Sequence, residues 1–135
     1  MRHHRVYLRN LLRRSGYDID WSAFSILTAH HPQLACALID AGCQLACTAA
    51  ADVELRHAAD TLANMAADPG TVTVAAPLLA AVTHTRVEIT ERGHNARARL
   101  HAACTAISDS GFGVLWPTTP QTDSPAGPST AAARS

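Results

Sequence analysis

Apolar positions in the first third of the chain recur at the spacing of an α-helix. Residues 2–15 place leucines on one face and arginines on an adjoining face, and Gly16 is expected to end this helix. A second, short helix is expected to begin after Asp20, whose carboxylate can cap it. Pro32 fits the first position of a third helix, because proline lacks the N–H that this position leaves unpaired.

The clearest amphipathic pattern follows in residues 52–66. Its apolar positions recur at i, i+3, i+4 and i+7, which predicts a helix with one buried face. Asp52 is expected to cap its start, and the Asp-Pro-Gly sequence at 68–70 is expected to stop it. On the polar side, Arg56 and Asp60 are four residues apart and are expected to pair.

Residues 71–90 fit two structures. Pro77 as the first helical residue and Gly93 as a C-terminal stop favour a helix, in which Glu88 pairs with Arg92. Alternating β-branched residues in the second half of this segment favour a short hairpin instead. The helix is the preferred prediction, and the hairpin would make the protein α+β.

The remaining pattern completes a prediction of fold class. Residues 95–110 read as a further helix with alanines, Leu100 and Ile107 inward. Residues 117–135 are rich in proline, serine and threonine and have no core pattern, so we expect a disordered tail. The chain is therefore predicted to be all-α: a small bundle of about five short helices over residues 1–116, followed by the tail.

Composition suggests that the core is thin. The chain has 27 alanines and only 27 leucines, isoleucines, valines and phenylalanines together. Alanine removes little apolar area from water, so a domain of this size gains by close helix packing or by self-association. The net charge of zero gives no general electrostatic attraction to nucleic acid.

The first helix is nevertheless strongly basic. Residues 1–14 carry five arginines and no acidic side chain, whereas residues 15–76 carry seven acidic side chains and one arginine. The five, which we call the arginine stripe, are Arg2, Arg5, Arg9, Arg13 and Arg14. The stripe suggests contacts with the phosphates of DNA or RNA as an alternative function. An anionic membrane surface or the chain's own acidic stretch from Asp18 to Asp68 would suit the same charges.

The four cysteines are the main candidates for chemistry. If one helix runs through them, Cys36, Cys43 and Cys47 lie within about 40° of one another. Their spacing is not that of a zinc or iron–sulfur site, and three thiols over eleven residues of a helix cannot converge on one tetrahedral ion. We expect reduced, metal-free cysteines that act mainly in packing. If a metal is present, the best ligands are Cys43, Cys47, His101 and Cys104.

No established catalytic motif occurs in the chain, which also lacks lysine. We therefore expect no enzymatic activity, no cofactor and no small-molecule substrate. The expected function is a non-enzymatic helical module that binds a protein partner or a second copy of itself. A cysteine- and histidine-based metal or redox sensor is a more distant alternative.

The expected location is the cytoplasm, with no transmembrane segment, because the longest apolar run, residues 72–82, is short and contains Pro77. The start of the chain lacks the uninterrupted apolar stretch of a secretory signal. Its arginine-rich, acid-free composition is also that of a mitochondrial presequence.

Overall fold

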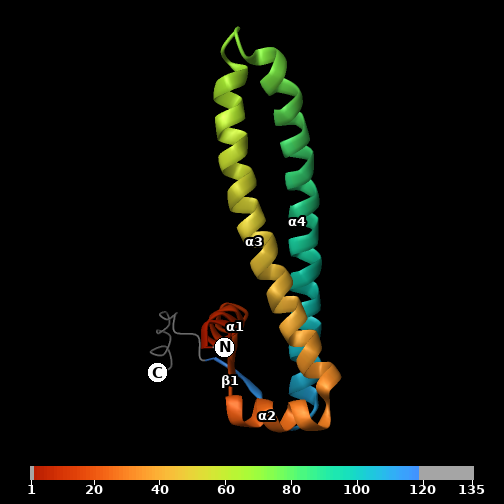
Figure 1. Ribbon diagram of the computed structural model, residues 1–135. Coiled ribbons are helices and arrows are strands. Elements are labelled where there is room, and N and C mark those ends of the chain that lie inside the picture. Colours follow the sequence, from red (N-terminus) through yellow and green to blue (C-terminus); the bar gives the residue numbers. More distant parts are fainter. Residues whose placement is uncertain (1, 119–135) are drawn as a thin grey trace, which may run out of the picture. The chain divides into compact units, whose positions relative to one another are not determined.

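The computed structural model describes residues 2–118, with side chains from Arg5 onward. The described residues form four helices and two short strands (Figure 1). In chain order these are α1 (Arg2–Arg14), β1 (Tyr17–Ile19), α2 (Trp21–His30), α3 (Pro32–Ala66), α4 (Val72–Asp109) and β2 (Leu115–Pro117). The all-α prediction is confirmed, although helices are fewer and longer than expected. Most of the expected tail, residues 119–135, lies outside the described residues.

The chain divides into two compact units. The first combines the N-terminal 35 residues with the segment from Cys104 onward, and the second spans Cys36–Ala103. Helices α3 and α4 each contribute to both units.

Individual residues determine where the helices of the first unit begin and end. Gly16 follows α1 with a φ of 92°, a left-handed conformation that favours glycine, and so ends the helix as expected. The carboxylate of Asp20 accepts hydrogen bonds from the backbone N–H groups of Ser22 and Ala23, at 2.9 and 3.2 Å, which confirms it as the N-cap of α2. Pro32 is the first residue of α3, also as expected.

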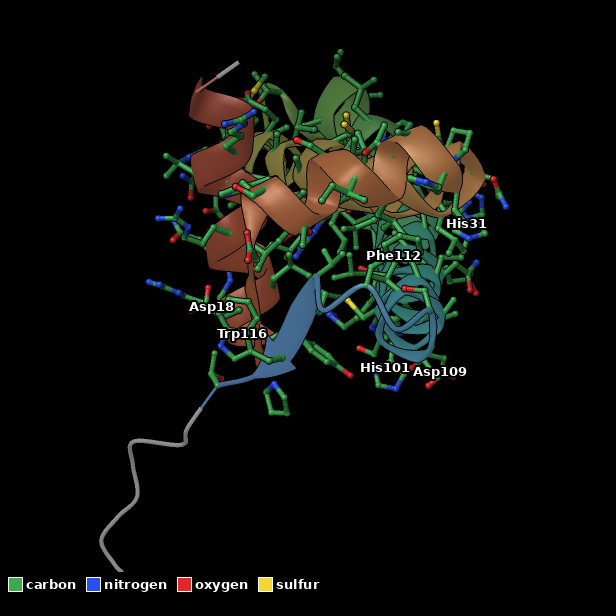
Figure 2. All side chains as sticks on the ribbon, turned by 90° about the horizontal axis from the view of Figure 1, so that it is seen from below. Asp18, His31, His101, Asp109, Phe112 and Trp116 are labelled. Carbon is green, nitrogen blue, oxygen red and sulfur yellow. The ribbon has the colours of Figure 1, made fainter. Side chains whose placement is uncertain are left out.

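A small antiparallel ribbon joins the two ends of the first unit. Strand β1 pairs with β2 in the register Tyr17–Pro117, Asp18–Trp116 and Ile19–Leu115. Asp18 and Trp116 of this ribbon are labelled in Figure 2. The ribbon was not predicted, and Pro117 belongs to β2 rather than to a tail. The buried side chains of this unit are Leu8, Leu11, Leu12, Ile19, Leu27, Ala35, Cys104, Ile107, Val114 and Leu115.

The second unit is a hairpin of two long antiparallel helix segments (Figure 1). Helix α3 runs through Asp52 without a break, so the prediction that Asp52 caps a separate helix is wrong. The expected stop at residues 68–70 is confirmed, since α3 ends at Ala66. Arg56 pairs with Asp52 rather than with Asp60.

Helix α4 likewise runs through both of its predicted boundaries. It begins at Val72, so Pro77 lies inside it, and it continues past Gly93 to Asp109. Residues 71–90 are therefore helical, and the alternative hairpin is wrong. Glu88 Oε2 lies 3.6 Å from His84 Nε2, and the expected pair between Glu88 and Arg92 does not form. A Cβ atom added to Gly93 would lie 3.5 Å from Thr48 Oγ1, so this glycine marks a close approach of the two helices rather than a helix end.

Both segments of the hairpin have buried or half-buried positions that recur every three and four residues in alternation. We call these positions the seam. On α3 they are Leu38, Ala41, Leu45, Thr48, Asp52, Leu55, Ala59, Leu62 and Ala66, and on α4 they are Ala75, Leu79, Val82, Arg86, Ile89, Gly93, Ala96, Leu100 and Ala103. This 3.5-residue repeat is that of a left-handed coiled coil.

An ion pair interrupts the seam. Arg86 Nε lies 3.7 Å from Asp52 Oδ1, and it is buried without a hydrogen-bond partner. The hydrogen bond from Arg56, together with the charge of Arg86, lowers the pKa of Asp52 below its ordinary value. A polar pair at such a position adds little stability but fixes which layers of the two helices face each other.

The seam predicts the effect of adding a methyl group at Gly93. We expect Gly93→Ala to raise the free energy of unfolding by about 0.5–1 kcal/mol, because alanine is the better helix former and its Cβ meets Thr48 at an ordinary contact distance. Urea denaturation followed by circular dichroism measures the change. The control Gly16→Ala should destabilise, because φ is positive there. A loss of stability in Gly93→Ala would mean that the helices are closer than described.

Candidate groove on the helical hairpin

One open groove of about 380 Å³ lies on the hairpin. It is lined from both helices by Cys43, Gln44, Cys47, Thr48, Arg92, Asn95 and Arg99. On α3 the two cysteines are one helical turn apart, and on α4 the two arginines are two turns apart. The contact between the helices brings the cysteines of α3 close to the arginines of α4, because Thr48 of α3 packs opposite Gly93 of α4.

The groove is positively charged. Arg92 and Arg99 line it, and none of its lining residues carries a carboxylate. A guanidinium N–H of Arg99 donates to Gln44 Oε1 across the hairpin, and Gln44 Nε2 donates to Asp40 Oδ2 at 3.4 Å. Asp40 itself is not among the lining residues, so the charged side chains that line the groove are the two arginines.

Three of the four cysteines are exposed. These are Cys36, Cys43 and Cys47, all on α3, and all four cysteines, Cys104 included, are free thiols. The predicted packing role is therefore confirmed for Cys104 alone and is wrong for the other three. Burial raises the pKa of the Cys104 thiol to about 11, since removing water disfavours the thiolate.

The residues suggested as a fallback metal site do not converge. Among residues 2–118, no group of three or more His, Cys, Asp or Glu side chains could hold a metal ion. Cys104 is fully buried, whereas Cys43 and Cys47 are exposed. A tetrahedral site built from this set is therefore absent from the described part of the chain.

Two members of the arginine stripe already have partners within the first unit. The Arg5 guanidinium lies 5.3 Å from the centre of the Trp21 ring, a cation–π contact, and an Arg13 nitrogen lies 3.5 Å from a carboxylate oxygen of Asp18. Arg9 and Arg14 are exposed. The side chain of Arg2 is outside the described part of the structure. Phosphate binding by the stripe stays a prediction.

Aromatic contacts gather at the end of α2. The Phe112 ring centre lies 5.6 Å from that of His30 and also 5.6 Å from that of His31. His30 Nδ1 is 3.0 Å from the carbonyl oxygen of Ile26, its own helix. These histidines therefore contact the loop after α4 within the first unit.

One of the described helices, α3, is long and apolar enough to cross a membrane. Its most apolar window has a mean hydropathy of 1.5, and 28% of that window is buried. Core helices of water-soluble proteins meet the same criteria, so the finding leaves the predicted cytoplasmic location untested.

Comparison with family models, with curated proteins and with solved structures found no match. The groove and the exposed surfaces of the hairpin are therefore the basis for assigning a function.

Exposure predicts how many thiols react in the folded protein. We expect Ellman's reagent to modify three thiols per native chain, namely Cys36, Cys43 and Cys47, and the fourth only after denaturation. Absorbance at the thionitrobenzoate maximum counts them. Loss of the slow thiol in Cys104→Ala would assign it, whereas four equally fast thiols would contradict the burial of Cys104.

Burial of Cys104 also predicts a dependence of stability on pH. The unfolded thiol loses its proton near its ordinary pKa of 9.0, whereas the folded thiol keeps it to about pH 11. Since the unfolded state binds fewer protons in this window, the free energy of unfolding should fall as the pH rises from 9.0 to about 11. Urea denaturation across the window should show a shallower fall for Cys104→Ala than for the wild type. Equal slopes would contradict the shift.

Proposed function

We propose that the protein is a non-enzymatic helical module that associates with a second copy of itself through one side of the α3–α4 hairpin. The observation that supports this proposal is a row of apolar and small side chains beside the seam that no other described element covers. Two helices alone bury only the sides that face each other, so further apolar residues stay in water unless another surface packs on them.

The row has a regular spacing. Positions seven residues apart lie on the same side of a coiled-coil helix, and both helices carry such a series on the same side of the hairpin. We call this surface the apolar flank: Ala51, Ala58 and Met65 on α3, with Leu78 and Thr85 on α4. Met65 is 36% exposed and Leu78 is 50% exposed, and Val74, at 63%, adjoins them. Removing such side chains from water is favourable by about 25 cal/mol per Å².

The opposite side of the hairpin differs in character. The positions that mirror the apolar flank there are Ala49, Arg56 and Ala63 on α3 and Ala76 and Thr83 on α4. This side carries a charge and a hydroxyl, and it has no apolar side chain larger than alanine where the flank has Met65 and Leu78. The contrast between the two sides favours association through the apolar flank.

A second copy is the occupant that the surface suits best. Two hairpins packed flank to flank would form a four-helix bundle, in which each helix gains the coiled-coil neighbour that it lacks. The zero net charge of the chain opposes self-association little. Further along the same side, Arg92 and Arg99 replace apolar residues, so the contact is expected to be limited to the part nearest the α3–α4 turn.

The proposal predicts that one charge on the apolar flank separates the copies. We expect sedimentation equilibrium to show a dimer of the wild-type chain and a monomer of Leu78→Glu, because burying an unpaired carboxylate is strongly unfavourable. Circular dichroism should show the same helicity for both.

The matched control is Val87→Glu. Val87 is on the same helix and is 56% exposed, but it lies nine residues after Leu78 and hence about 180° around the helix. This variant should remain dimeric. A wild-type chain that is monomeric at every concentration, or equal dissociation of both variants, would refute the proposal.

A further inference from the structure

We propose that Cys43 and Cys47 form a two-thiolate site for a soft monovalent metal ion, of which copper(I) is the representative. Both thiols are exposed and line the same groove on the hairpin. The site is independent of the proposed self-association, because it lies beside Arg92 and Arg99, where the apolar flank has ended.

The helix geometry disfavours a disulfide between Cys43 and Cys47. In an unbroken helix the Cβ atoms of residues four apart are about 5–6 Å from each other. A disulfide needs Cβ atoms about 3.5–4.5 Å apart. Since α3 runs unbroken through both cysteines, joining their sulfur atoms would require the helix to distort. An ion bonded to both sulfur atoms lengthens the bridge by one more bond, so it can span the larger separation with the helix intact.

Coordination number selects the class of ion. The groove offers two thiols, and its other lining groups are amides, a hydroxyl and guanidiniums, with no histidine or carboxylate. Zinc needs four good ligands, and calcium or magnesium needs several oxygen ligands. Thiolate ligands favour soft copper(I), which can be held by two of them. Our expectation of metal-free cysteines rested on the tetrahedral requirement, which a two-coordinate ion does not impose.

The positive charges of the groove favour the anionic complex that forms when copper(I) binds. Binding replaces two S–H protons by one ion: Cu⁺ and two thiols give a bis-thiolate complex of charge −1 and two released protons. No electron is transferred. Arg92 and Arg99 place positive charge beside this anion from the facing helix, and no carboxylate lines the groove to oppose it.

The direct test is an anaerobic titration of the reduced full-length protein with copper(I) in competition with the chromogenic chelator bicinchoninate. We expect one ion per chain, bound intramolecularly. Cys43→Ser and Cys47→Ser should each weaken binding by at least about 100-fold, and Arg92→Gln or Arg99→Gln by about 10-fold, as for the loss of an outer partner of a metal site. Circular dichroism checks that each variant is folded.

Cys36→Ser is the matched control. Cys36 is also exposed on α3, but it lies two turns before Cys43, about 10.5 Å along the helix, too far to share the ion. This variant should bind copper(I) like the wild type. The proposal is overturned if Cys36→Ser loses binding equally, if a serine at 43 or 47 leaves affinity unchanged, or if half an ion binds per chain with an affinity that depends on protein concentration.

Discussion

The contact between α3 and α4 along the seam is the interaction on which the second unit depends. Alanine, glycine and threonine are interspersed with larger apolar residues along the seam, and the two helices approach closely where small residues meet, as at Thr48 and Gly93. Small side chains gain less from burial than leucine does. The hairpin therefore achieves its register through shape and through the Asp52–Arg86 pair, and it leaves much of its apolar surface on the outside.

That arrangement explains why a surface and a groove occur together on one side of the hairpin. Both follow the same seven-residue repeat, and only the identity of the side chains changes along it. Near the turn, the repeat places Met65 and Leu78, which water hydrates poorly. Farther from the turn, it places Gln44, Arg92 and Arg99, which water hydrates well. One geometric rule thus gives one region suited to another helix and another suited to a small charged species.

Sequence patterns predicted those features whose cause is local. Gly16, Asp20 and Pro32 act through their own backbone or through groups two or three residues away, and each was identified correctly. Asp52 and Gly93 resemble local boundaries but are used across the hairpin, which a single segment cannot reveal. The alignment of three thiols on one helix face was likewise predictable, but the arginines beside them were not, because the register between α3 and α4 is a tertiary property. The strands β1 and β2 are three residues each, too short to give a pattern.

The β1–β2 ribbon has a consequence for the order in which the chain folds. Its partners Tyr17 and Pro117 are separated by nearly the whole described chain, so their pairing closes a long loop. During synthesis β1 emerges early and waits for β2, while the hairpin between them can form as soon as its own residues have left the ribosome. A hairpin that has already formed shortens the effective loop and lowers the entropy lost on closing it. Pairing of β1 with β2 therefore costs less entropy once the intervening helices have formed.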